Sequence, residues 1–369
     1  CNSNPRSSGE KRTVNDQKKA AIDENSKTIE EIPLIDPGNS ASTGLLMEIQ
    51  NHLRGLYGRK KRVHVILSGE RYSVDISDVY MDMDFQEMDS TSVRCTDINH
   101  TSTPPDNRVI SDNKCINKTQ NKPFNPIIIV GDSGSGKSTW CNHFVQCWSR
   151  NSKIEDANIE GLNVPDLGKF KFLIYLQLNS SDRGLSFQEI LEQSLFQQQP
   201  AYSQIIMRCL YDENYAPSIL ILIDGLDKVG DDIKPIPELL DLKLLSLCTV
   251  ILTSRPSIFR QTFDTRIDSS MQLKLFKVCD MTQEKSKIYI EKVCMSLTEQ
   301  HKKLFSADDF LMFTKYLHLQ HMLKNPYLCL TLLSVWTRKK SLIEITDVLL
   351  DIVEHCLRRA RTDERVKKN

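Results

Sequence analysis

The chain has 369 residues, with 48 Lys and Arg against 48 Asp and Glu, so its formal net charge is zero. This balance argues against a protein that binds nucleic acid through bulk positive charge. The longest aliphatic run, Ile219–Ile223, is far shorter than the ~20 residues that cross a bilayer, and the N-terminal region carries charges throughout instead of an apolar signal segment. We therefore expect no membrane insertion. The 11 scattered cysteines, without a Cys-x-x-Cys pair, favour a reducing, cytoplasmic location.

The first part of the chain alternates polar and ordered stretches. Residues 1–43 are rich in Ser, Asn, Lys and Glu and are predicted to be a disordered arm. Residues 44–88 show a helical pattern and then strand-like alternation from Val63 to Leu67, which predicts a small ordered element. Residues 89–123 are again polar and are interpreted as a linker. The missing initiator Met suggests a fragment or an incomplete gene model.

From residue 124 onward, apolar strand-like runs alternate with helical stretches. Such alternation predicts a parallel sheet covered by helices, which we place over 124–280. From Thr282 the apolar period changes to 3.6, which predicts an all-helical domain over 281–369 with an incomplete C-terminus. The expected fold class is therefore α/β followed by a small helical domain. The four apolar runs span 127–130, 170–178, 218–223 and 249–253.

The strongest motif is a buried strand that runs into a Gly-x-x-x-x-Gly-Lys-Ser loop and then a helix. Its glycines leave backbone N–H groups free to surround phosphate oxygens, and the start of the helix adds positive charge. Lys137 is predicted to reach the β- and γ-phosphates, and the Ser138 hydroxyl to bind Mg²⁺. The alternative is a plain glycine turn before a helix. The loop residues are Gly131, Asp132, Ser133, Gly134, Ser135, Gly136, Lys137, Ser138 and Thr139.

Three further residues follow the ends of predicted strands. Asp224 ends an aliphatic run on a neighbouring strand and is predicted to be the Walker B residue that holds Mg²⁺, although a lone Asp there is often a helix cap. Asp227 is a candidate for polarising the attacking water, or for simply stabilising the next turn. Arg255 leaves the next strand and is a candidate for sensing or neutralising the γ-phosphate, or is an exposed loop arginine.

These motifs together resemble the NACHT domain of NOD-like receptors, in the STAND class of signalling NTPases. The similarity covers roughly 124–360 and depends on the phosphate loop, on Asp-Gly-Leu-Asp ending at Asp227 and on Thr-Ser-Arg-Pro around Arg255. The resemblance implies bound ATP or ADP with Mg²⁺, Asp224 at the metal and Arg255 as the first sensor arginine. It also implies that Pro326 packs on the adenine, although Asn325 and Pro326 also make a good helix start.

The sequence departs from the family pattern at Lys228, where many members carry an acidic residue. A cation there should weaken activation of water, so hydrolysis is expected to be slow or absent. The chain also ends shortly after 342–357, whereas the family continues into winged-helix and further domains, so we interpret it as truncated after the first helical domain. The basic run Arg59–Arg62 is interpreted as solvated, with a nuclear-import signal or an anion-binding patch as the alternatives.

The function expected from this resemblance is a nucleotide-controlled signalling switch in innate immunity or cell death. Nucleotide exchange would rearrange the domains, and the ATP-bound form would self-associate. The protein signalling partners are not identified by the sequence. The rival hypothesis is a turnover enzyme, namely a P-loop ATPase that is not a receptor. A scaffold that folds around nucleotide without switching is a third possibility.

A zinc site at His318 and His321 lacks partner ligands at suitable spacing.

Overall fold

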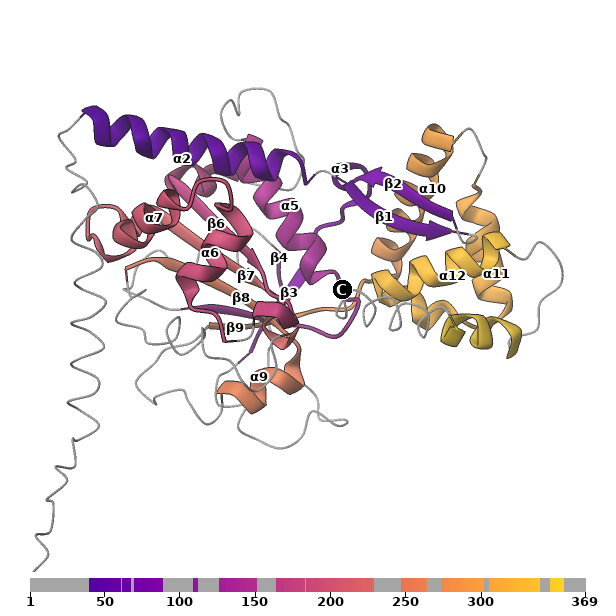
Figure 1. Ribbon diagram of the computed structural model, residues 1–369. Coiled ribbons are helices and arrows are strands. Elements are labelled where there is room, and N and C mark those ends of the chain that lie inside the picture. The colour runs from indigo at the N-terminus through magenta and orange to yellow at the C-terminus, as the bar shows by residue number, and fades with distance from the viewer. Residues whose placement is uncertain are drawn as a thin grey trace, which may run out of the picture. The chain divides into compact units, whose positions relative to one another are not determined.

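The computed structural model describes most of the chain between residues 40 and 354 (Figure 1). Residues 49–369 form one compact unit and residues 1–48 another, and each is considered by itself. The predicted disordered arm lies outside the described part except for its last residues, which begin helix α2 (Ser40–Gly58). The described ranges are 40–60, 62–67, 70–88, 109–111, 126–150, 164–182, 184–228, 247–263, 274–301, 305–338 and 346–354.

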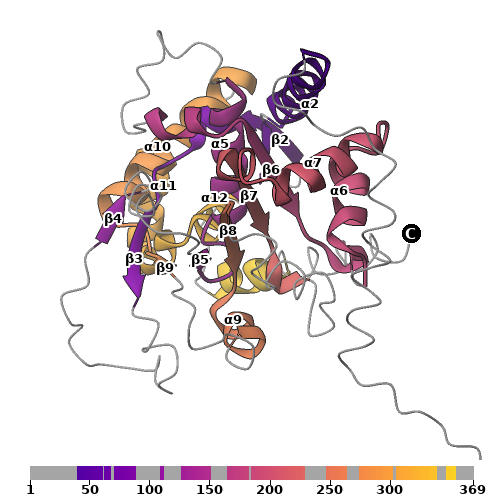
Figure 2. The same ribbon diagram turned by 90° about the vertical axis from the view of Figure 1, so that its left-hand side faces the viewer.

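A seven-stranded sheet forms the centre of the α/β part, in the order β4-β3-β9-β5-β8-β7-β6, and Figure 2 shows its strands side by side in this order. The strands from β9 to β6 are parallel, whereas β3 is antiparallel to β9 and β4 is antiparallel to β3. The bounds are β3 Asp84–Met88, β4 Val109–Ser111, β5 Ile127–Val130, β6 Phe172–Gln177, β7 Ile219–Asp224, β8 Thr249–Ser254 and β9 Lys274–Val278.

The four predicted apolar runs coincide with β5, β6, β7 and β8. Every residue of β5 and β7 is buried, as expected for strands that are covered on both faces. The predicted α/β fold with a parallel sheet is confirmed for the strands from β9 to β6, and β3 and β4 add an antiparallel pair at one edge. These two strands come from the segments interpreted as a small element (44–88) and a linker (89–123), and the domain boundaries remain predictions.

Helices and short 3₁₀ turns connect the strands. Helix α5 contacts β6 and β7, and α6 contacts β6. Helix α6 begins with a capping box in which the Ser186 side chain accepts from the N–H of Glu189, and the Glu189 carboxylate accepts from the N–H of Ser186. The bounds are α5 Lys137–Arg150, η1 Val164–Lys169, η2 Ser180–Asp182, α6 Phe187–Leu195, α7 Ala201–Tyr211, η3 Ala216–Ser218, η4 Leu226–Lys228 and α9 Pro256–Phe263.

The helical part contains α10 (Gln283–His301), α11 (Ala307–Tyr316), η5 (Gln320–Lys324) and α12 (Pro326–Arg338). Helix α11 begins directly after Ser306, whose hydroxyl accepts from the N–H of Asp309 at 3.2 Å. A further helix covers residues 346–354.

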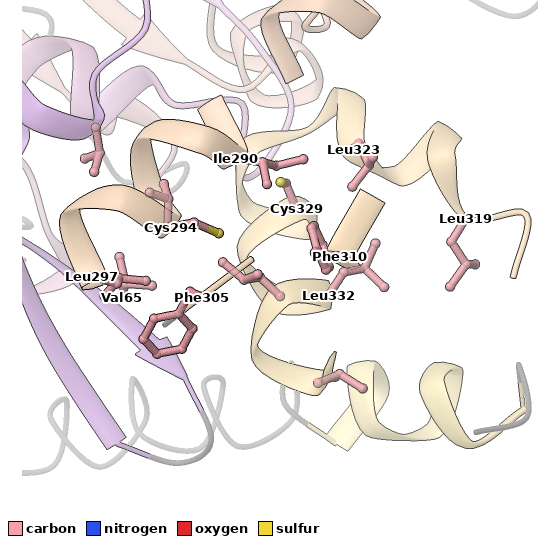
Figure 3. Packing of buried hydrophobic residues seen from close by; sticks show 14 of the residues in the cluster. Val65, Ile290, Cys294, Leu297, Phe305, Phe310, Leu319, Leu323, Cys329 and Leu332 are labelled. Atoms are coloured by element: carbon pink, nitrogen blue, oxygen red, sulfur yellow. The ribbon is translucent and has the colours of Figure 1, made fainter. Parts of the chain in front are cut away.

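A hairpin from the N-terminal segment completes the core of the helical part. Strands β1 (Arg62–Leu67) and β2 (Glu70–Asp75) pair antiparallel, and the short helix α3 (Ile76–Val79) follows. Val65, Tyr72 and Val74 of this hairpin are buried in one cluster with residues of the helices, as Figure 3 shows for Val65 beside Leu297. The hairpin and the helices therefore share one hydrophobic core.

Candidate functional site

The phosphate loop connects β5 to α5, as the motif predicts. Gly134 and Gly136 have φ angles of 82° and 98°, in the left-handed region that residues with a Cβ rarely adopt. At Gly131 the constraint is steric, because a Cβ there would lie 2.8 Å from the Ser135 hydroxyl oxygen. The Gly131 N–H donates to the Ser254 carbonyl of β8 at 3.2 Å. The glycines and the hydrogen bond to the neighbouring strand thus support the observed conformation of the loop.

Lys137, the first residue of α5, folds back over this loop. Its ammonium donates to the carbonyl oxygens of Gly131 at 2.6 Å and Asp132 at 2.9 Å. Burial lowers the pKa of the Lys137 side chain, and the carboxylates of Asp227 and Asp224 act in the opposite direction. The ammonium therefore lies in the loop and within electrostatic reach of both acidic residues. Ser138 and Thr139 follow it in the half-buried first turn of the helix.

Asp224 ends β7 and is almost completely buried. One carboxylate oxygen accepts from the Thr253 hydroxyl at 2.7 Å and the other from the Gln177 side-chain amide at 3.3 Å. The Thr253 hydroxyl also accepts from the Gly225 N–H at 3.2 Å. Hydrogen bonds from two neighbouring strands thus fix the orientation of a buried carboxylate, as expected for a charged group in this environment.

Asp227 and Arg255 form an ion pair, which sequence reasoning did not foresee. The Arg255 Nε lies 2.7 Å from an Asp227 carboxylate oxygen, and their side chains are 51% and 7% exposed. The arginine is therefore accessible from solvent while the carboxylate is covered. In this conformation the cation predicted to sense phosphate neutralises the carboxylate predicted to polarise water.

The strand order corrects one detail of the sequence interpretation. We predicted Asp224 on a strand next to the phosphate-loop strand, but β8 lies between β5 and β7. Thr253, near the end of β8, connects this middle strand to β7 through its hydrogen bond to Asp224. Its polar side chain directly after the apolar run 250–252 was the signal in the sequence that would have identified it.

The start of helix α12 lies against the phosphate loop. The Asn325 side-chain amide donates to the Ser133 carbonyl at 3.2 Å, and the Tyr327 N–H donates to the Gly134 carbonyl at 3.3 Å. Asn325 also caps the helix, because its side-chain oxygen accepts from the Tyr327 N–H at 3.0 Å and the Leu328 N–H at 3.2 Å. Pro326 lies close by, since a Cβ on Gly136 would be 3.9 Å from its ring. The helical part therefore contacts the loop directly.

The segment before β3 reaches the same loop, a contact that the sequence analysis did not predict. A Cβ on Gly136 would lie 3.7 Å from the Met83 sulfur. Next to it, Asp84 pairs with Lys285 of α10 at 2.7 Å, and the Lys285 ammonium also donates to the Asp82 carbonyl at 2.9 Å. The loop thus lies between two segments that are distant in sequence, one upstream and one in the helical part.

The residues of the loop fit a nucleotide phosphate chain with Mg²⁺. Gly134 and Gly136 have positive φ angles and no Cβ, so a phosphate can approach the backbone N–H groups of the loop. Lys137 supplies a cation there. Mg²⁺ is usually held by one or two side-chain oxygens together with waters and phosphates, and Ser138 and Asp224 provide such oxygens. Across the described ranges, His, Cys, Asp and Glu form no group of three or more that would hold a metal by themselves. None of the described helices is long and apolar enough to span a membrane.

A match to a family model supports nucleotide binding at this site. Residues 125–297 match the model of the NACHT domain family. No curated protein matches the sequence significantly. Two solved structures of Hsp104, one in a closed state with ATPγS and FITC casein and one from S. cerevisiae with casein, match at TM-scores of 0.41 and 0.37 and at 12% and 14% identity. These matches cover 65% and 58% of this chain but only 40% and 34% of Hsp104. The family match covers less than half of the chain. Together with the P-loop and the α/β sheet, it supports a nucleotide-binding P-loop NTPase domain similar to NACHT domains at residues 125–297.

Proposed function

We propose that the chain is an ATP- and ADP-dependent signalling switch of the NOD-like receptor type. The observation that carries the proposal is the pair of hydrogen bonds between the phosphate loop and helix α12, from Asn325 to Ser133 and from Tyr327 to Gly134. Because the loop is also the proposed phosphate site, a nucleotide that reshapes it changes the contacts available to the helical part. A ligand shifts such an equilibrium only through different affinities for the two arrangements.

Each site residue has a proposed role in this switch. The loop 131–139 would surround the phosphates, with Lys137 at the β- and γ-phosphates. Ser138 and Asp224 would hold Mg²⁺, which neutralises phosphate charge when it is bound. Pro326 would pack on the adenine, a role supported by its position beside Gly136.

The ion pair between Arg255 and Asp227 gives the switch a second element. A γ-phosphate would compete with the Asp227 carboxylate for the guanidinium, which binds phosphate through two parallel hydrogen bonds. Release of Arg255 would leave Asp227 free to accept a proton from water. Arg255 would therefore distinguish ATP from ADP, and any hydrolysis would depend on first breaking this pair.

Calorimetry with ATP and ADP in Mg²⁺ tests the nucleotide site. We expect micromolar binding by the wild type, a loss of at least tenfold in Lys137→Ala because a charge-assisted contact is removed, and no change in Lys287→Ala. Lys287 is an exposed helix residue that pairs with Glu291. Folded wild-type protein that binds neither nucleotide would contradict the proposal, and phosphate release at many turnovers per minute would favour the rival ATPase.

The Gly134→Ala variant tests the contact between loop and helix. A Cβ at this position would lie 2.6 Å from the Tyr327 Cβ and 2.8 Å from the Asn325 side-chain oxygen, on a backbone with φ 82°. We expect faster hydrogen exchange at the start of α12 without nucleotide and a stability loss of about 1–3 kcal/mol, the usual cost of such backbone strain. Gly55→Ala is the control, because a Cβ there meets nothing within 4 Å. Unchanged exchange in α12 would show that the contact does not couple the two parts.

The remaining parts of the proposal come from the family resemblance. Self-association of the ATP-bound form, a role in innate immunity or cell death, and a cytoplasmic location are all typical of NOD-like receptors. Sedimentation of the protein with ADP and with a non-hydrolysable ATP analogue tests the first of these. A monomer under both conditions would argue for the scaffold that binds nucleotide without switching.

A further inference from the structure

Lys228 occupies a defined place at the candidate phosphate site. It ends the short turn η4, and its N–H donates to the Gly225 carbonyl at 2.9 Å. The side chain then folds back over Gly225, because a Cβ on that glycine would lie 3.0 Å from Cδ and Cε and 3.1 Å from the ammonium nitrogen. Gly225 has φ 87°, a left-handed conformation that favours glycine. The Lys228 side chain also fills the space that a Cβ would need. The ammonium is thus held near the residue that directly follows Asp224.

The charge of Lys228 reaches the beginning of the phosphate-loop helix. Burial and the Asp224 carboxylate raise the pKa of the Cys141 thiol in α5, whereas the charges of Lys137 and Lys228 act in the opposite direction. Cys141 is one helical turn after Lys137. The two lysines are therefore both within electrostatic range of this turn, one from the loop and one from the end of β7.

Lys60 adds a third cation near Asp224. It lies between α2 and β1, with its ammonium 4.6 Å from the centre of the Tyr175 ring. Burial lowers the pKa of Lys60, and the Asp224 carboxylate raises it. Because this side chain is half-buried and turned toward the sheet, the interpretation of the run Arg59–Arg62 as uniformly solvated is wrong for Lys60.

The carboxylate that would hold the metal also accepts hydrogen bonds from the protein. Both oxygens of Asp224 accept hydrogen bonds, from Thr253 and Gln177. Asp227 is paired with Arg255. Asp224 is therefore hydrogen-bonded by neutral protein donors and Asp227 is paired with a cation, whereas the Lys228 side chain is exposed.

We propose that Lys228 is a phosphate-binding residue that takes over part of the role of Mg²⁺, so that this chain holds ADP and ATP with only weak dependence on magnesium. The inference rests on the proposed nucleotide site. An ammonium on a flexible stem is an effective point charge for phosphate, and it replaces an acidic residue that would repel phosphate unless a metal lay between them. The ammonium neutralises phosphate charge without occupying Asp224.

Calorimetry of nucleotide binding with Mg²⁺ and with EDTA tests this role. We expect the wild-type dissociation constant for ADP to change less than about threefold on removal of Mg²⁺. In Lys228→Ala we expect binding in EDTA to weaken about tenfold, the factor for one charged hydrogen bond of ~1.4 kcal/mol, with most of the affinity restored by Mg²⁺. Lys228→Arg should retain binding in EDTA, and Lys228→Glu should bind only with Mg²⁺.

Two controls separate the possible failures. Lys287→Ala removes an exposed lysine on α10 and should bind like the wild type under both conditions. Thermal unfolding of each variant confirms that it is folded, which is expected because the Lys228 side chain is exposed. Wild-type binding that requires Mg²⁺, or Lys228→Ala that binds like the wild type in EDTA, would overturn this inference. Absence of binding by the folded wild type in both buffers would instead overturn the nucleotide site itself.

Discussion

His143 shows how one buried residue responds to the elements around it. Its imidazole ring stacks on the Tyr80 ring, with centroids 3.7 Å apart and an angle of 11° between the planes. The Cys147 sulfur lies 3.7 Å from its Nε2 on the next turn of α5. Burial, and then the charges of Arg150 and Lys292, lower the pKa of His143 from 6.5 to about 4. The folded chain therefore keeps this imidazole neutral where the unfolded chain protonates it.

The pKa shift of His143 predicts a pH dependence of stability. Between pH 6.5 and about 4 the unfolded state binds a proton that the native state does not, so the free energy of unfolding falls as the pH falls through this range. The loss amounts to about 3 kcal/mol at most. Urea unfolding of the wild type and His143→Gln across this range measures it, and the difference between their slopes isolates the imidazole.

The control for this experiment is a histidine that is exposed to solvent. His64, on β1, is exposed, so His64→Gln should retain the slope of the wild type. If His143→Gln lost stability with pH as steeply as the wild type, the pKa of His143 would not be lowered by folding. The carboxylates of the chain contribute equally to all three proteins and cancel in the comparison.

At the scale of elements, Tyr57, near the end of helix α2, covers the outer edge of the sheet at β6. Strand β6 is the last strand in the sheet, so alternate backbone groups on its outer side lack a partner strand. The Tyr57 hydroxyl donates to the Leu173 carbonyl at 3.0 Å and accepts from the Tyr175 N–H at 2.9 Å. One buried side chain thereby satisfies the two backbone groups that an additional strand would bind.

Tyr57→Phe tests this cover of the edge. The variant keeps the ring, which packs edge-on against Trp148 of α5, but leaves a buried N–H and a buried carbonyl unpaired. We expect a loss of about 1–3 kcal/mol in the free energy of unfolding, measured by urea titration. Tyr316→Phe removes a hydroxyl that is 74% exposed and should have little effect. Equal stability of the two variants would mean that water replaces the Tyr57 hydroxyl at the edge.

The sequence predicted those elements whose signal is local. Strands β5 to β8 are continuous apolar runs, and burial on both faces leaves no other choice of residue type. Strand β9 was missed because Lys274 and Lys277 interrupt its short apolar pattern. Strand β3 was missed because it is mostly polar, with only Phe85 buried. Both strands depend on pairing with segments that are distant in the chain, and a local sequence pattern does not predict such pairing.

At the scale of the whole molecule, the shared core links the hairpin β1–β2 to the helical part. Val74 is completely buried in the same cluster as Leu297 and Leu332, and the Tyr72 ring meets Phe305 edge-on at 6.5 Å. The hairpin precedes the P-loop in sequence, whereas these helices follow the sheet. The helical part is therefore complete only with a contribution from the upstream segment.

Val74→Ala tests this dependence. Removal of two methyl groups from the core should cost about 2 kcal/mol, and hydrogen exchange should accelerate in α10 and α12 more than in α5. Arg71→Ala, on an exposed position of the same strand, is the matched control. Faster exchange confined to the hairpin would show that the helices keep their core without it.

The residues that would bind nucleotide could be predicted from the sequence, but the residues that contact them could not. The P-loop, Asp224 and Arg255 are carried by motifs with fixed spacing, and their positions at the ends of β5, β7 and β8 follow from the parallel strands. The ion pair with Asp227 and the contacts of Asn325 and Met83 with the loop depend on tertiary packing. Such contacts between distant segments leave no periodic pattern in the sequence.

The antiparallel strand β3 has a practical consequence for protein production. The family match begins at residue 125, after β3 and β4. A shortened chain that started there would leave β9, with buried Leu275 and Phe276, as an unprotected border with free N–H and carbonyl groups. Exposed strands of this kind recruit other chains and promote precipitation. Recombinant versions of this domain should therefore begin before Asp84, and soluble yield as a function of the starting residue would reveal where the folding unit begins.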